Sequence, residues 1–307
     1  MRNKILAVAI AFVLLLGACR SNSETELEPT PSDAAASADN APMRATLSIT
    51  DLADNAVIVP SAPKRVISLS PTVTEIFYAL DCANALIGAD EMSDYPGAAA
   101  NLTRYDASDI AAIIKTAPDL VLTGQGFSEN DAAQLRAADI SVACGEAATY
   151  DDYVRGIVFV AQVMGVDATF LTDVQANISD IYAREKNYEQ MNVLLVTAFD
   201  GVNITSSAPG AFFGNITNTL GCNSLSDTLG ASFPISRLRD VDEPQLILIT
   251  NDVNYQLFIE TEGVKELGAV QGGRVYPVDA ALMTRAGPRV DEALLTLFDM
   301  FEQAALS

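Results

Sequence analysis

The chain has 307 residues, with 18 basic and 40 acidic side chains, no histidine and a formal net charge of −22. An acidic surface of this kind repels phosphate backbones, so we expect no binding of nucleic acid. The absence of histidine removes Ser-His-Asp and Cys-His catalysis, most zinc sites and the commonest haem ligand. We therefore expect no enzymatic activity, no cofactor and no metal site of the protein's own.

The N-terminal region predicts export and a lipid anchor. Arg2 and Lys4 form a basic start, and twelve apolar residues follow at positions 5–16. A run of this length is too short to cross a bilayer of about 30 Å, so residues 1–18 are predicted to be a signal peptide. Leu16-Gly17-Ala18-Cys19 resembles the bacterial lipobox. That resemblance implies a lipid on Cys19 and a protein anchored to the outer face of the cell membrane.

Residues 19–45 predict a disordered tether, because they hold mostly Ser, Glu, Thr, Pro, Asp and Ala and have almost nothing to bury. The next segment, residues 46–60, alternates loosely around Asp54-Asn55 and predicts a short hairpin. The residues from 46 to the end are enough for two lobes of ordinary domain size.

The first lobe is predicted to span residues 46–164. Short apolar strands are predicted at 66–69, 85–88, 119–123 and 140–142, with helices between them. Pro71 suits the first position of a helix, where no backbone N–H is needed. Strands that alternate with helices predict a mostly parallel sheet that is covered on both faces.

The middle of the chain predicts helices, because apolar residues recur there at helical spacing with a break at Gly165-Val166-Asp167. A long, rigid connecting helix is expected over about residues 167–189, within a connecting segment of residues 165–190. A second lobe, residues 191–307, repeats the strand–helix scheme, and Pro118 and Pro244 precede similar apolar strands. The predicted fold class is α/β, with two doubly wound lobes joined by a long helix and a ligand cleft between them.

Four motifs resemble one family of transport proteins. They lie at residues 64–75, 93–96, 117–121 and 285–290. In order and spacing they resemble the helix-strut substrate-binding proteins of ABC importers, which carry cobalamin, ferric siderophores or haem. Ser93-Asp94-Tyr95-Pro96 and the arginine-flanked motif at 285–289 are most similar to the corrinoid-binding branch. The resemblance covers about residues 46–305 and implies a monomer that passes a macrocyclic or chelate ligand to an ABC permease.

The same resemblance implies a set of ligand contacts. Tyr105 and Phe233 match aromatic positions in opposite lobes, and Arg285 matches an arginine that reaches the ligand's periphery. The full set is Met92, Tyr95, Tyr105, Gln125, Phe127, Thr205, Phe233 and Arg285. The tyrosines, Phe233 and Arg285 also have a purely structural interpretation. Glu75 is interpreted as an acid that the N-terminus of its helix stabilises.

Two acidic residues are implied to dock on the permease, namely Glu129 in the first lobe and Asp240 in the second. The alternative ligand is a ferric siderophore, because anionic chelates could pair with arginines. The arginines available for this are Arg104, Arg237, Arg239, Arg285 and Arg289. Haem would need tyrosine or methionine as its iron ligand. A secreted α/β enzyme that uses paired carboxylates is the remote alternative.

Overall fold

The computed structural model describes residues 45–306. The predicted signal peptide, Cys19 and nearly all of the predicted tether lie outside these residues. The described part begins with the expected hairpin, in which β1 (Thr46–Thr50) and β2 (Ala56–Pro60) pair antiparallel. Asp51 fastens this hairpin to the first lobe, because its Oδ2 accepts a hydrogen bond from the backbone of Cys144 at 3.0 Å.

A five-stranded parallel sheet in the order β5-β4-β3-β6-β7 forms the centre of the first lobe. Its strands are β3 (Val66–Leu69), β4 (Leu86–Asp90), β5 (Arg104–Tyr105), β6 (Leu120–Thr123) and β7 (Ser141–Cys144). The helices of this lobe are α1 (Pro71–Ala79), α2 (Ile110–Thr116), α3 (Glu129–Ala137) and α4 (Tyr153–Met164), with 3₁₀ turns η1 (Ala83–Ala85) and η2 (Gly97–Asn101).

Alternation along the strands divides the side chains between two helical layers. Ile67 and Val121 pack with α2 and α3, whereas Val66, Leu120 and Leu122 pack with α1 and α4. Successive side chains of a strand point to opposite faces of a sheet, so each short apolar strand serves both layers. The predicted parallel sheet with two covered faces is therefore confirmed.

The connecting segment contains α5 (Leu171–Ala183), a helix of 13 residues. This helix is shorter than the helix predicted over residues 167–189. Phe170 stands at its N-cap position, and residues 184–190 are mostly exposed, polar and non-helical. This last stretch offers too few apolar side chains to bury a further helical face.

The second lobe holds a four-stranded parallel sheet in the order β11-β8-β13-β14. Its strands are β8 (Asn192–Val196), β11 (Asn223–Ser224), β13 (Leu246–Thr250) and β14 (Val275–Val278). The sequence did not predict a second, antiparallel sheet, which consists of β9 (Ala198–Phe199), β10 (Asn203–Thr205) and β12 (Ser232–Pro234). The helices are α6 (Phe212–Thr219), α7 (Ser226–Leu229), α8 (Tyr255–Glu260), α9 (Gly268–Gln271), α10 (Ala280–Thr284) and α11 (Val290–Ala305), with the 3₁₀ turn η3 (Ile235–Asp240).

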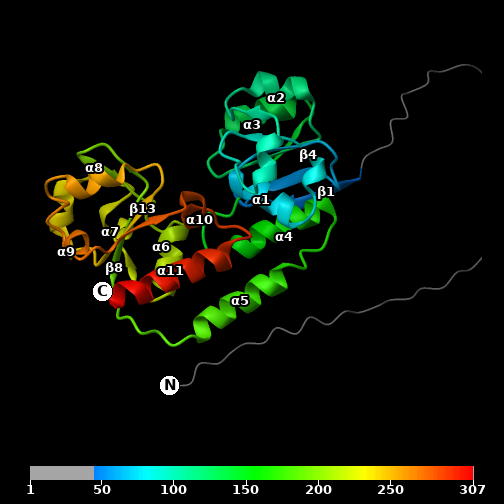
Figure 1. The fold of residues 1–307 in the computed structure, drawn as a ribbon. Helices are drawn as coiled ribbons and strands as arrows, with labels where there is room; N and C mark the ends of the chain where they lie inside the picture. The colour runs from blue at the N-terminus through cyan, green and yellow to red at the C-terminus, as the bar shows by residue number, and fades with distance from the viewer. Residues whose placement is uncertain (1–44, 307) are drawn as a thin grey trace, which may run out of the picture. The chain divides into compact units, whose positions relative to one another are not determined.

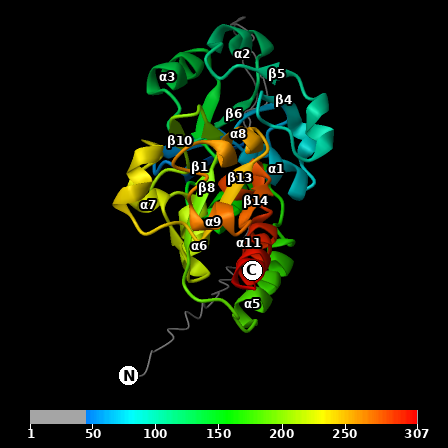
Figure 2. The same ribbon diagram turned by 60° about the vertical axis from the view of Figure 1, so that its left-hand side comes forward.

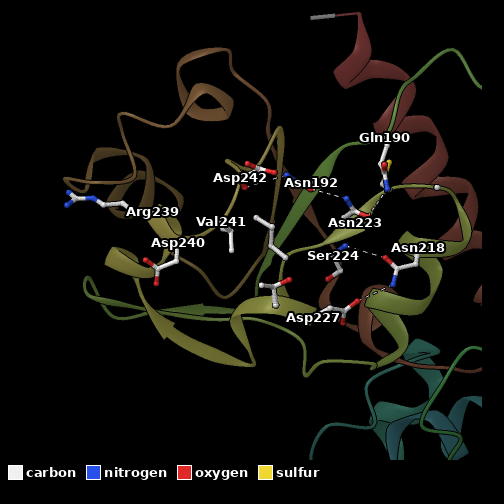
Figure 3. A pocket seen from close by; sticks show the side chains of 14 residues that line it. Gln190, Asn192, Asn218, Asn223, Ser224, Asp227, Arg239, Asp240, Val241 and Asp242 are labelled. Atoms are coloured by element: carbon white, nitrogen blue, oxygen red, sulfur yellow. Dashed lines mark hydrogen bonds between the residues drawn. The ribbon is translucent and has the colours of Figure 1, made fainter.

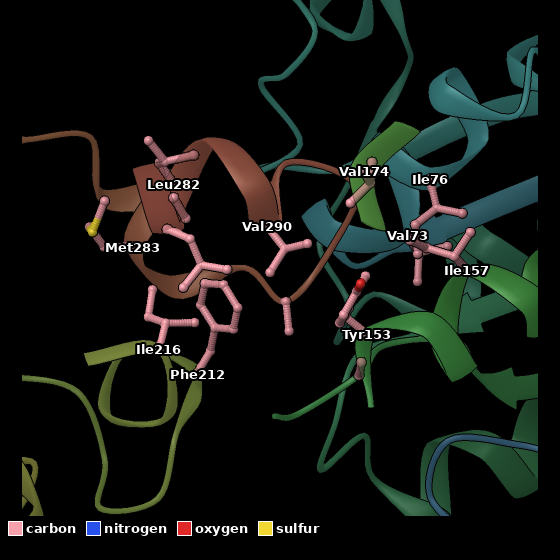
Figure 4. Close-up of a cluster of buried hydrophobic side chains, with 14 of the residues drawn as sticks. Val73, Ile76, Tyr153, Ile157, Val174, Phe212, Ile216, Leu282, Met283 and Val290 are labelled. Atoms are coloured by element: carbon pink, nitrogen blue, oxygen red, sulfur yellow. The ribbon is translucent and has the colours of Figure 1, made fainter. Parts of the chain in front are cut away.

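One hydrophobic core joins the two lobes. It brings together Val73 of α1, Ile157 of α4, Val174 of α5, Phe212 of α6 and Val290 of α11 (Figure 4). The C-terminal helix α11 runs beside α5 in both ribbon views (Figures 1 and 2). Among residues 45–306, no helix combines the length and apolar character that a membrane span requires.

Candidate ligand-binding site

The candidate site lies at the carboxyl ends of β3 and β4, because open parallel sheets bind ligands at the carboxyl ends of their strands. Ser70 directly follows β3 and caps α1, with its Oγ accepting from the backbone N–H of Val73. A loop of residues 91–96 connects β4 to η2. Thr74 of α1 ties this loop down, since its Oγ1 lies 2.8 Å from Ser93 Oγ. Ser93 in turn donates to the carboxylate of Asp90.

Arg104 holds the same loop from within the first lobe. Its Nη1 donates to the carbonyl oxygens of Asp90 and Ser93, at 2.8 Å each. Its Nη2 donates to the carbonyl oxygen of Ala99 at 3.2 Å. The guanidinium group is therefore occupied by three backbone carbonyls of the first lobe.

A cluster of ion pairs lies where the second lobe meets this loop. Glu75 of α1 is almost completely buried, with 3% of its side chain exposed. Arg289 makes two bonds to its carboxylate at 2.9 Å, and Arg285 makes a third at 2.7 Å. Asp94 accepts from Arg285 at 3.0 Å. We call these four residues, Glu75, Asp94, Arg285 and Arg289, the charged cluster.

Two exposed apolar side chains stand beside the charged cluster. Arg289 lies over one face of the Tyr95 ring, with its Cζ 4.0 Å from the ring centroid, a cation–π arrangement. Tyr95 is nonetheless 45% exposed, and Met92 is 65% exposed. Arg285 also donates to the carbonyl oxygen of Met92 at 3.0 Å. The two motifs at 93–96 and 285–289 are thus in direct contact, although about 190 residues separate them.

Two further carboxylates lie at the same edge of the first sheet. Burial raises the pKa of Asp90, although Ser93 donates a hydrogen bond to it. Burial also raises the pKa of Glu146, which accepts from Ser70, from the backbone of Gln125 and from Thr72. Within residues 45–306, no three acidic or cysteine side chains are grouped in a way that could hold a metal ion.

Known proteins share the sequence pattern of this chain. The sequence of residues 66–282 matches a family described as "Periplasmic binding protein". The chain belongs to this family. It is 24% identical over 261 residues to an uncharacterised ABC transporter substrate-binding lipoprotein, YvrC, of Bacillus subtilis, a match covering 81% of this chain and 83% of that protein.

Two further known proteins are similar to this chain. A vitamin B12-binding protein of Vibrio parahaemolyticus is 23% identical over 250 residues, which is 78% of this chain and 90% of that protein. The solved structure of the periplasmic heme-binding protein BhuT in complex with two hemes superposes with a TM-score of 0.70 at 24% identity, covering 79% of this chain and 99% of that one. The predicted α/β fold is also the fold of this structure.

Arg285, Met92 and Tyr95 meet at the charged cluster, but other predicted contacts lie elsewhere. Tyr105 packs its ring over Gly88, and its hydroxyl bonds Thr116 at 2.8 Å. Its ring therefore lies between Gly88 of β4 and Thr116 of α2, inside the first lobe, and does not join the charged cluster.

The remaining predicted contacts are divided between loops and core. Gln125 donates its amide to the carbonyl oxygens of Glu146 and Leu52. Phe127 packs against the core under α2 and α3, and Thr205 is exposed on β10. Phe233 differs most from its prediction, because it is 2% exposed in the core of the second lobe. In this structure its ring has no free face for a ligand.

Both proposed docking acids are exposed. Glu129 is the first residue of α3 and pairs with Arg136, and Asp240 ends η3 and pairs with Arg237 at 2.9 Å. The structure also shows two surface pockets away from the charged cluster. One, of about 870 Å³, is lined by β2, β7 and Phe127. The other, of about 820 Å³, is lined by amides and acids that include Asp240 (Figure 3).

The pocket of Figure 3 is not our candidate ligand site. Asn192 and Asn223, which line it, are the first residues of β8 and β11. The pocket therefore opens at the amino ends of these strands, whereas ligands of open α/β sheets bind at the carboxyl ends. The charged cluster and the exposed side chains of Met92 and Tyr95 meet that requirement.

Proposed function

We propose that this protein is the extracytoplasmic binding component of an ABC importer and that its ligand is a corrinoid. The observation that carries the proposal is the charged cluster, which joins both lobes and leaves Met92 and Tyr95 exposed at the carboxyl end of β4. The B12-binding relative supports the ligand class. Cys19 carries the lipid anchor in this proposal, as the description of YvrC as a lipoprotein supports.

The charges around the cluster favour a neutral or cationic ligand over an anionic chelate. Arg104 is bound to backbone carbonyls, while Arg285 and Arg289 are neutralised by acids of the protein itself. Asp90 and Glu146 are two further acids at the same edge. An anionic siderophore would need free cationic groups here. A corrinoid, whose periphery carries neutral amides, does not.

Haem is the second candidate. Met92 and Tyr95 are both exposed on one loop, and methionine and tyrosine are residue types that can ligate haem iron. The heme-binding structural neighbour shares the fold. In this alternative the same loop would hold the ligand, through a bond to iron and not through apolar contact alone.

Calorimetric titration of the soluble domain tests the proposal. We expect cobinamide or cobalamin to bind at one molecule per chain. Tyr95→Ala and Met92→Ala should each weaken binding by about 1–3 kcal/mol, or about five- to a hundredfold, because each removes apolar cover from the ligand. Ile58→Ala is the matched control, since Ile58 is similarly exposed but lies on the hairpin strand β2.

Two results would contradict this ligand assignment, namely saturable binding of a ferric siderophore without corrinoid binding, and binding of haem alone. Corrinoid binding with unchanged affinity in both alanine variants would contradict the assignment of the site to the loop of Met92 and Tyr95.

A further inference from the structure

The loop that carries Met92 and Tyr95 is held by both lobes. Arg104 binds its carbonyl oxygens from the first lobe. Arg285 reaches it from the segment between α10 and α11, and binds the carbonyl oxygen of Met92 and the carboxylate of Asp94, both at 3.0 Å. Since α10 packs against α6, the hydrogen bonds from Arg285 connect the loop to the second lobe.

The two arginines have little capacity left for a ligand. Arg285 directs Nη1 to two carboxylates and Nη2 to a carbonyl oxygen, and only 10% of its side chain is exposed. Arg289 gives Nε and Nη2 to Glu75, and Tyr95 covers its guanidinium plane. A buried carboxylate left without its cationic partners would be strongly unfavourable, so the arginines are committed to Glu75.

The backbone fixes the direction from which the arginines approach. A Cβ atom at Gly287 would lie 3.1 Å from Thr72 Cγ2, closer than ordinary van der Waals contact. The segment between Arg285 and Arg289 therefore lies directly against α1. The backbone that carries both arginines is therefore held against α1, the helix that carries Glu75.

We propose that Glu75, Arg285 and Arg289 are positioning residues, which hold the Met92–Tyr95 loop against the second lobe and thereby set how long the ligand stays bound. They do not contact the ligand. The effect on the ligand rests on the proposed function, whereas the effect on the loop does not.

Hydrogen exchange of the ligand-free protein tests the hold on the loop. Arg285→Lys and Arg289→Lys keep the charge but lose the planar fork that makes several bonds at once. In each variant, amide exchange in a peptide covering residues 91–96 should accelerate by about tenfold or more. A peptide covering β7 should be unchanged. Arg136→Lys, which alters only an exposed pair with Glu129, is the matched control and should change neither peptide.

The second measurement is the dissociation rate of cobinamide, which should rise by about tenfold in the same variants. Should a lysine variant fail to fold, Glu75→Gln serves instead, with the same expected changes. Unchanged exchange in residues 91–96, equal acceleration in both peptides, or an unchanged dissociation rate would each overturn the proposal. Accelerated exchange together with no corrinoid binding by the wild type would sustain the hold on the loop and refute the proposed ligand.

Discussion

Glu146 is a buried acid whose protonation should affect stability. Burial raises its pKa above the usual value near 4.5, so the folded protein binds this proton more tightly than the unfolded chain does. The stability that Glu146 contributes is therefore present at acid pH and is lost as the pH rises through its folded pKa. The opposite holds for a carboxylate whose pKa is lowered.

Glu146→Gln, which mimics the neutral acid, should therefore reduce the loss of stability between about pH 4 and about pH 7. Urea denaturation of both proteins across this range measures the effect. The free energy of unfolding of the variant should increase relative to that of the wild type as the pH rises. If the free energy of unfolding of the variant instead falls relative to that of the wild type as the pH rises, the hydrogen bonds from Ser70 and Gln125 outweigh the cost of burial.

Single residues were the hardest part of the site to predict. Arg285 and Tyr95 were predicted to contact the ligand, and the structure brings both to the charged cluster. Glu75 was interpreted as an acid that the N-terminus of its helix stabilises, whereas the structure buries it against two arginines. Its position among Val73, Ile76 and Phe77, in an apolar helix, was the available signal. Pairing over 210 positions in the chain leaves no local pattern.

At the level of elements, the core between the lobes should make them unfold together. Ile157 of α4 is fully buried in the cluster that also contains residues of α6 and α11. Ile157→Ala should lower the free energy of unfolding by about 2–5 kcal/mol, because it removes apolar contact and leaves a cavity. Chemical denaturation should show a single transition in wild type and variant.

Leu257→Ala is the control for this measurement, since Leu257 is exposed on α8, and it should change stability by less than about 1 kcal/mol. Two separate transitions in the wild type would mean that the lobes unfold independently. A loss no larger than that of the control would remove Ile157 from the core that joins them.

The elements with strong local patterns were predicted, and the weak ones were not. Strands β3, β6 and β13 are short apolar runs bounded by helix-starting or helix-ending residues, and each was expected near its observed place. The sheet of β9, β10 and β12 was missed, because strands of two or three residues are too short for alternation to show. It depends on a turn at Gly201, with φ of +95°, and on Asp200, which accepts from the backbone of Val202.

At the scale of the whole molecule, the protein is proposed to dock on its permease through Glu129 and Asp240. Glu129→Arg combined with Asp240→Arg should leave ligand affinity unchanged and impair uptake, because charge pairs at such interfaces mainly set orientation and association rate. Glu129→Arg alone should have the smaller defect. Ligand affinity and uptake are to be measured on the same variants.

Asp299→Arg is the matched control for the docking variants, since Asp299 is also exposed but lies on α11, where it pairs with Arg184. It should leave uptake unchanged. Normal uptake in the double charge reversal would place the permease contact elsewhere on the surface.

The central claim is that a corrinoid is the ligand, and the absorption spectrum of the full-length protein purified from its native host tests it most directly. A corrinoid, a haem and a ferric siderophore have distinct visible spectra, so the spectrum identifies the bound ligand without a titration of each candidate. The account predicts corrinoid bands at close to one equivalent per chain, which shift to those of the added ligand when cobinamide of different axial ligation displaces the native one. A haem Soret band, or the charge-transfer band of a ferric chelate, would contradict it.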